Sequence, residues 1–169
     1  MTGSLLLRPF EVKDEQPALA AHRALKADEF SFLLGYEEGM AWSDWLDDVE
    51  RARQGIDLTP NRVRAALLAA DINGDLVGRV SIRFELNEWL AKEGGHIGYA
   101  VLPEFRRRGY ATEILRQAID IGRHEGVDRL LIVCNETNIG SAAVIERCGG
   151  AFERSAVSGD GIPIRRYWM

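Results

Sequence analysis

Three consecutive arginines, Arg106, Arg107 and Arg108, stand directly before Gly109, at a point where the sequence pattern changes from strand to helix. The first turn of a helix carries unpaired backbone N–H groups and about half a positive charge, so it attracts anions. A glycine lets an anion approach the main chain, and neighbouring arginines add positive charge. The segment 101–111 therefore predicts a phosphate-binding turn; the alternative is a solvated basic turn that only begins a helix.

The better-known nucleotide motifs are missing from the sequence. It contains no Gly-x-x-x-x-Gly-Lys-Ser/Thr, and no Gly-x-Gly-x-x-Gly follows a predicted strand. Kinase, GTPase and dinucleotide-dehydrogenase functions are therefore excluded as interpretations of the basic turn.

Length and composition indicate one domain spanning residues 1–169. The 169 residues are 46% hydrophobic and 28% charged, and the net charge of −5 disfavours nucleic acid as the main partner. Cys134 and Cys148 are too few for a disulfide framework or a four-cysteine zinc site, so no metal is expected. Since no apolar run is long enough to span a membrane and the first residues lack a secretory pattern, we expect a cytoplasmic protein that does not act at membranes.

Hydrophobic periodicity predicts the elements that must position the turn. Helices are expected over residues 14–27, 41–54, 109–126 and 138–148. Strands are expected over residues 5–8, 65–70, 76–84, 96–102, 129–134, 151–157 and 164–168. The strict alternation in 76–84 predicts a strand with one buried face. A helix connects 96–102 to 129–134, so these two strands should run parallel. The fold class is α/β, of the α+β type with a mixed sheet.

This order of elements, with Arg106-x-x-Gly109-x-Ala111 between strand and helix, Asn138 at a helix start and Gly149-Gly150 at its end, resembles the GNAT N-acetyltransferase superfamily. The resemblance covers residues 65–157, and segments 94–99 and 166–168 are similar to a bacterial subgroup of predicted acetyltransferases. It implies a mixed, mostly antiparallel sheet flanked by helices, in which strands 96–102 and 129–134 splay apart. Residues 65–157 would form the cofactor-binding core, and residues 1–60 would supply acceptor-side helices.

The resemblance also implies acetyl-CoA as co-substrate. Main-chain amides of residues 106–111 would hold its pyrophosphate, and the pantetheine arm would lie between the splayed strands. The backbone N–H of Val101 would stabilise the oxyanion, and Asn138 would reach the pantetheine or act only as a helix cap. The expected cofactor-binding residues are Val101, Leu102, Arg106, Arg107, Arg108, Gly109, Tyr110, Ala111, Asn138 and Ser141.

The general acid is harder to assign. Many members of the family carry a tyrosine seven residues after the asparagine, and Ile145 stands at that position here. Either the thiolate leaves unaided, which its ordinary pKa of about 8.5 permits, or Tyr99, Tyr110 or Tyr167 serves as the acid.

Three side chains are candidates for the base that takes the proton of the amine: Glu85, Glu88 and His96. They lie on or near the strands that should line the cleft, and an imidazole has a suitable ordinary pKa. The alternatives are a buried histidine with a structural role and two solvated glutamates.

An acidic segment, formed by Glu37, Glu38 and the helix 42–54, suggests a cationic acceptor, although such a helix face is more often only solvated. Trp42 and Trp45 suit a core better than an aromatic cage.

We therefore expect an acetyl-CoA-dependent N-acetyltransferase that moves an acetyl group to a primary amine by direct attack in a ternary complex. Alternatives are a non-catalytic acyl-CoA-binding sensor of the same fold and an interaction protein without a ligand. A homodimer is also conceivable.

Overall fold

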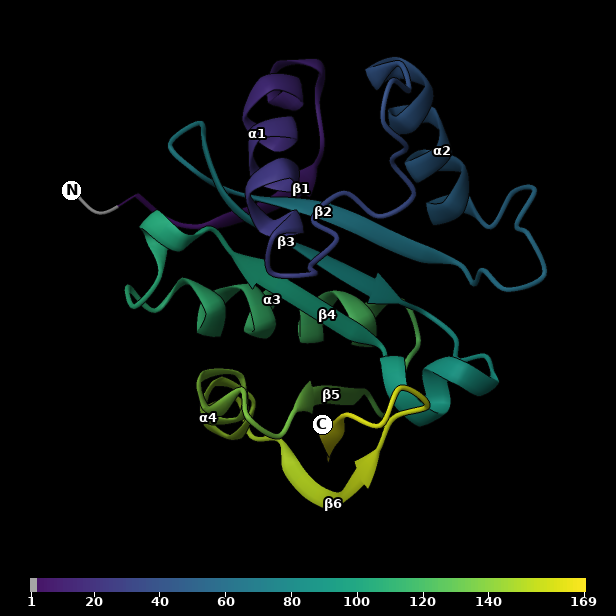
Figure 1. Ribbon diagram of the computed structural model, residues 1–169, viewed down its shortest axis with the longest axis vertical. Helices are drawn as coiled ribbons and strands as arrows, with labels where there is room; N and C mark the ends of the chain where they lie inside the picture. The colour runs from purple at the N-terminus through teal and green to yellow at the C-terminus, as the bar shows by residue number, and fades with distance from the viewer. Residues whose placement is uncertain (1–2) are drawn as a thin grey trace.

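Two antiparallel sheets form the centre of the computed structural model, which describes residues 3–169 (Figure 1). The first has the order β1 (Leu6–Pro9), β2 (Ala65–Ile72), β3 (Asp75–Arg83) and β4 (Ile97–Val101). The second has the order β5 (Leu131–Asn135), β7 (Pro163–Trp168) and β6 (Ala151–Val157). The helices are α1 (Glu15–Lys26), α2 (Trp42–Gln54), α3 (Tyr110–His124) and α4 (Ile139–Arg147). The predicted fold class is confirmed; residues 1 and 2 of the predicted domain lie outside the described part.

Helices cover both faces of the first sheet. Figure 1 shows α1 and α2 on one side of β2 and β3 and α3 on the other. Leu115 of α3 packs in one core with Val80 of β3, whereas Trp45 of α2 packs in a second core with Leu67 of β2. Residues 76–82 of β3 are consequently all buried. The prediction of one buried face for this strand is wrong. Alternate residues of β3 face α3 on one side and the layer of α1 and α2 on the other, so neither face is open to solvent.

Arg79 attaches the loop between α1 and α2 to the first sheet. Its side chain is buried beneath the loop between α1 and α2, where Nε donates to the carbonyl of Phe32 at 3.0 Å and Nη2 donates to that of Ser31 at 2.7 Å. Nη1 donates to the carbonyl of Gly98 at 3.2 Å. A buried guanidinium satisfied by three backbone carbonyls fastens the loop to the sheet.

Strands β4 and β5 meet at one junction and then diverge. The backbone N–H of His96 donates to the carbonyl of Leu131 at 2.7 Å, and the N–H of Leu131 donates to Nδ1 of the His96 ring at 2.8 Å. Beyond this point no ladder joins the two strands within residues 3–169. The expected splay is present, but β4 and β5 belong to separate sheets, and in the described residues the His96 N–H to Leu131 bond stands in place of a parallel ladder.

Gly95 permits the close approach at this junction. It has φ 66° and ψ −174°, and a Cβ built on it would lie 2.7 Å from the carbonyl oxygen of Leu131. This backbone region is accessible almost only to glycine. A π-helical turn over Leu90–Gly94, which the sequence pattern did not predict, precedes it and delivers the chain to the junction.

Replacing Gly95 by alanine should therefore destabilise the fold more than the same change at an open glycine. We expect Gly95→Ala to lower the free energy of unfolding by about 2–4 kcal/mol, from backbone strain and the clash with Leu131. Gly39→Ala is the matched control, because Gly39 has φ 88° with nothing within 4 Å of the added Cβ, and it should cost about 1 kcal/mol. Urea unfolding measures both; equal losses would contradict the close approach.

Candidate functional site

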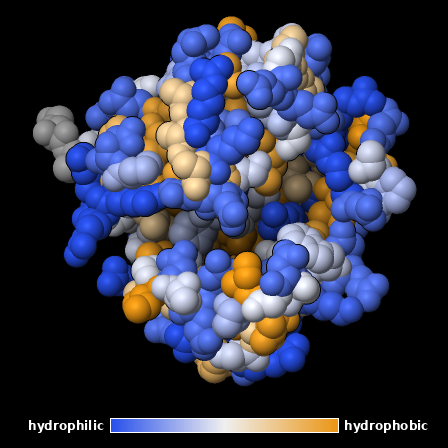
Figure 2. Space-filling model, in the orientation of Figure 1, coloured by the Kyte–Doolittle hydropathy of each residue, from blue (hydrophilic) through white to orange (hydrophobic). Residues whose placement is uncertain are grey.

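A cavity of about 720 Å³ lies where β4 and β5 diverge, at the N-termini of α3 and α4. The space-filling view in Figure 2 shows the surface hollowed between the half that carries α1 and α2 and the half that carries α4 and β6. Among the predicted cofactor-binding residues, those that line the cavity are Val101, Arg106, Arg107, Gly109, Tyr110, Ala111, Asn138 and Ser141. Sequence segments far apart in the chain thus meet at one cavity.

The N-terminus of α3 supplies the positive end of this cavity. Gly109 is the N-cap residue with φ 83°, no side chain caps the helix, and a Cβ built on Gly109 would meet nothing within 4 Å. The N–H groups of the first turn are thus not capped by a side chain. Arg106 donates through Nε to the carbonyl of Val101 at 3.1 Å, which holds its guanidinium beside β4. This end of the cavity is built to hold an anion.

Two residues expected at the cofactor do not line the cavity. The N–H of Leu102 donates to the carbonyl of Val77 at 2.9 Å, its carbonyl accepts from Phe105, and its side chain packs in the core beneath α1 and α2. Arg108 turns outward, where it donates to the carbonyl of Glu104 and its guanidinium lies 5.6 Å from the centre of the Phe105 ring. Neither Leu102 nor Arg108 is therefore among the residues that line the cavity.

Val101 directs its backbone N–H away from β3. Hydrogen-bonded and non-bonded pairs alternate in an antiparallel ladder. The bonds from Leu102 N–H to Val77 and from Arg83 N–H to His96 fix which pairs are bonded, and the pair of Gly78 with Val101 is a non-bonded one. Since Val101 also lines the cavity, its N–H faces the gap between β4 and β5.

Tyr99 and Ser141 meet on the wall of the cavity. The phenol oxygen of Tyr99 and the Oγ of Ser141 are 3.0 Å apart, and Ser141 donates its backbone N–H to Oδ1 of Asn138 at 3.0 Å. Asn138 therefore is the helix cap that its position predicted. Burial raises the pKa of Tyr99 to about 12, so the phenol keeps its proton at neutral pH. Tyr99 thus places a protonated hydroxyl on the cavity wall, and either oxygen of the Tyr99–Ser141 pair can donate to the other.

The other tyrosine candidates have different surroundings. Ile145 is fully buried in the core, and Tyr167 donates to a carboxylate oxygen of Glu146 at 3.0 Å without lining the cavity. Tyr110 lines the cavity at the first turn of α3. Asp28, which sequence reasoning did not single out, is the acidic side chain among the lining residues. Only the fold could have found it, because it belongs to an irregular segment after α1.

The three candidate bases lie outside this cavity. Glu85 is exposed in the loop that follows β3, and Glu88 is exposed and pairs with Lys92 at 2.8 Å. His96 is buried at the junction of β4 and β5, where its Nδ1 is occupied by the Leu131 N–H. Burial, and then the charge of Arg83, lower the pKa of His96. The structure thus gives His96 a place in the framework and brings none of the three to the cavity.

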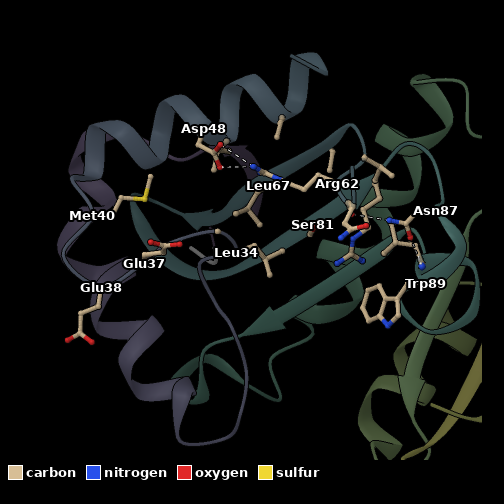
Figure 3. Close-up of a pocket in the computed structure, with 18 residues that line it drawn as sticks. Leu34, Glu37, Glu38, Met40, Asp48, Arg62, Leu67, Ser81, Asn87 and Trp89 are labelled. Atoms are coloured by element: carbon tan, nitrogen blue, oxygen red, sulfur yellow. Dashed lines mark hydrogen bonds and ion pairs between the residues drawn. The ribbon is translucent and has the colours of Figure 1, made fainter. Parts of the chain in front are cut away.

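A second cavity of about 850 Å³ lies between α2, the loop before it and strands β2 and β3 (Figure 3). Glu37 and Glu38, whose charge suggested a cationic acceptor, are among the residues that line it. Trp42 and Trp45 are buried in the core and do not line it, so they are core anchors.

The described residues hold neither a metal cluster nor a membrane span. In residues 3–169 no group of three or more His, Cys, Asp or Glu side chains could hold a metal ion. Within the same range no helix has the length and apolar character needed to cross a bilayer.

The sequence matches the acetyltransferase (GNAT) domain over residues 4–151. This chain therefore belongs to the GNAT acetyltransferase family. A comparison with curated proteins finds no match.

Solved structures share the fold at low sequence identity. RimJ of Mycobacterium smegmatis, in complex with CoA-disulfide, is 19% identical with a TM-score of 0.72, covering 99% of this chain and 82% of the other. The microcin C7 self-immunity acetyltransferase MccE, in complex with acetyl-CoA and AMP, is 22% identical with a TM-score of 0.65, covering 98% and 91%. An acetyltransferase of Agrobacterium tumefaciens is 24% identical with a TM-score of 0.65, covering 99% and 92%.

The burial of His96 predicts a pH dependence of stability. Its pKa is lowered in the folded state, so the unfolded chain, with a histidine pKa near 6.5, binds more protons as the pH falls. The stability that the neutral ring contributes is therefore present above about pH 6.5 and is lost as the pH falls from there towards the folded pKa.

His96→Asn should reduce this loss, because the amide oxygen accepts the Leu131 N–H and does not titrate. Urea unfolding at a series of pH values between about 7 and 5 measures it. His22→Asn is the comparison, since burial also lowers the pKa of His22 and its Nδ1 accepts from Leu33 N–H. A slope against pH unchanged in His96→Asn would show that His96 titrates normally.

Proposed function

We propose that this protein transfers the acetyl group of acetyl-CoA to a primary amine by direct attack in a ternary complex. One observation carries the proposal: the cavity between β4 and β5 combines an uncapped helix N-terminus, at Gly109, with a backbone N–H, at Val101, that β3 does not use. The first suits a pyrophosphate and the second a developing oxyanion. Acetyl-CoA or a CoA derivative in the MccE and RimJ structures, which share this fold, supports the choice of ligand.

The cofactor is held mainly by backbone groups. The amides of residues 106–111 bind the pyrophosphate, and Arg106 and Arg107 add positive charge at the same end of the cavity. The pantetheine arm lies between the diverging strands, with Asn138 and Ser141 on the side of α4. The thioester then stands beside Val101.

The reaction follows from the groups around that position. The amine nitrogen attacks the thioester carbonyl carbon, and the N–H of Val101 stabilises the oxygen anion by about 3–4 kcal/mol, as oxyanion donors do in other acyl transfers. The C–S bond then breaks, and the sulfur leaves as a thiolate that accepts a hydrogen bond from Tyr99. Asp28 accepts the proton that the nitrogen loses. Amine and acetyl-CoA thus give the amide, the CoA thiolate and one proton.

A second function is favoured by Ile145. This residue fills the position where many relatives carry a tyrosine, so a non-catalytic acyl-CoA-binding sensor of the same fold is the alternative. Release of free thiol from acetyl-CoA in the presence of any amine decides in favour of the enzyme.

The proposed pyrophosphate site predicts that Gly109→Asp greatly weakens the binding of acetyl-CoA. The substitution places a carboxylate where the pyrophosphate should lie, and calorimetric titration at fixed salt should show at least a hundredfold weaker binding, roughly 3 kcal/mol. Gly126→Asp is the matched control, since Gly126 has φ 91° and open space at the opposite end of the same helix. Equal affinity in wild type and Gly109→Asp would refute the site.

The role of Tyr99 predicts a loss of rate without a loss of cofactor affinity. Tyr99→Phe removes a hydrogen bond to a charged sulfur, worth about 1.5–3 kcal/mol, so kcat should fall roughly 10- to 150-fold. Tyr167→Phe is the control, because that hydroxyl bonds to Glu146 outside the cavity. Steady-state thiol release measures both variants. An unchanged kcat in Tyr99→Phe would remove this residue from the reaction.

A further inference from the structure

Arg83 is a half-buried cation without a carboxylate partner. It ends β3 and lines the second cavity. Its hydrogen bonds within residues 3–169 use Nη1 alone, which donates to the carbonyls of Gly94 and Gly95 at 3.3 Å each. Burial alone lowers its pKa, which agrees with the lack of an ion pair in the described residues. Neither Nε nor Nη2 is a fully buried unpartnered atom, so both donors are at least partly accessible to solvent on a residue that lines the cavity.

The guanidinium lies close to the strand that carries the proposed oxyanion donor. A Cβ built on Gly98 of β4 would be 3.8 Å from Nη1 of Arg83. Gly98 and Val101 are three residues apart on β4, which corresponds to roughly 10 Å along a strand. Phe30 lines the first cavity and Leu34 lines the second, so a single short segment borders both. The two cavities are therefore neighbours in the fold, separated by this segment.

The other charges of the second cavity are either paired or exposed. Arg62 donates to both carboxylate oxygens of Asp48 at 3.1 Å. Glu37 and Glu38 are exposed, and Figure 3 places Glu37 at the opposite end of the cavity from Asn87 and Trp89. Solvent screens exposed carboxylates, whereas a half-buried guanidinium keeps more of its field. Arg83 is thus the charge that most needs a partner.

We infer that the second cavity holds the amine acceptor and that Arg83 binds a carboxylate of this acceptor. The inference rests on the proposed acetyl transfer. A guanidinium with two available donor groups matches a carboxylate in geometry, and Ser81, on the same face of β3, adds a hydroxyl. Because the guanidinium of Arg83 lies beside Gly98, and Gly98 is roughly 10 Å from Val101 along β4, the amine and the carboxylate of the acceptor are separated by several bonds. Linear ω-amino carboxylates and short peptides have this shape, and glycine does not.

Acceptors that differ only in the group facing Arg83 test the inference. Thiol release from acetyl-CoA is measured with aminohexanoate, its amide and hexanediamine, and in a second arm with triglycine and triglycine amide. The carboxylates should exceed the amides and the diamine in kcat/KM by at least about tenfold. If aminohexanoate has the higher kcat/KM, the acceptor is a small amino carboxylate; if triglycine has the higher kcat/KM, it is a peptide.

Variants assign the preference to Arg83. Arg83→Gln should remove the preference for carboxylates, and Arg83→Lys should keep part of it because the charge remains. Arg62→Gln is the matched control, since it removes a paired arginine from the same cavity and should leave the preference unchanged. Acetyl-CoA affinity, measured by calorimetry, should be the same in all of these variants.

The outcomes separate this inference from the function on which it rests. Equal rates with carboxylates and amides, faster turnover of the diamine, a preference that survives in Arg83→Gln, or no turnover of these amines by protein that binds acetyl-CoA would each overturn the Arg83 subsite. Failure of the folded wild type to bind acetyl-CoA would instead overturn the proposed function. If Arg83→Gln does not fold, the wild-type preference and Arg83→Lys decide.

Discussion

The junction between His96 and Leu131 is the constraint on which the rest of the site depends. In a continued parallel ladder, the backbone carbonyl of His96 would accept an N–H from β5. Here that carbonyl accepts from Arg83 of β3 instead, and the imidazole Nδ1 of His96 takes the N–H of Leu131. The backbone pairing between β4 and β5 stops after one bond, and the strands diverge. The cavity lies in the gap beyond this point, where the N–H of Val101 faces away from β3.

Two arginines on one face of β3 differ in how completely the fold satisfies the donors of their guanidinium groups. Arg79 is completely enclosed, and all three nitrogens of its guanidinium donate to carbonyls of Ser31, Phe32 and Gly98. Arg83 lies four residues further along, at the strand end, and only Nη1 is used. A buried cation without bonds is costly, so the first is complete as a structural clamp. The second has donors that only a ligand or solvent can satisfy.

The sequence was most informative where the determinants are local. The turn before α3 could be predicted because the strand end, the arginines and Gly109 are adjacent in the chain, and the turn does line a cavity. The two-sided burial of β3 could not be predicted, because a strand with two helical covers keeps the same alternation. The sequence could not decide between a catalytic and a structural His96, or show that β3 uses the N–H of Leu102. The direction of an N–H or an imidazole depends on strand pairing with residues distant in the sequence.

The absence of a tyrosine at position 145 does not exclude the proposed acetyl transfer. The role of a phenol beside the leaving sulfur is defined by geometry and not by sequence position. Ile145 of α4 is buried in the core. The phenol of Tyr99, on β4, forms a hydrogen bond with Ser141, which lies on the same helix as Ile145. Its pKa of about 12 exceeds the ordinary thiol value of about 8.5, so a complete proton transfer to the thiolate is unfavourable by roughly 5 kcal/mol. Tyr99 is therefore better suited to donate a hydrogen bond to the leaving sulfur than to protonate it. A thiolate is a good enough leaving group at neutral pH to depart without a general acid.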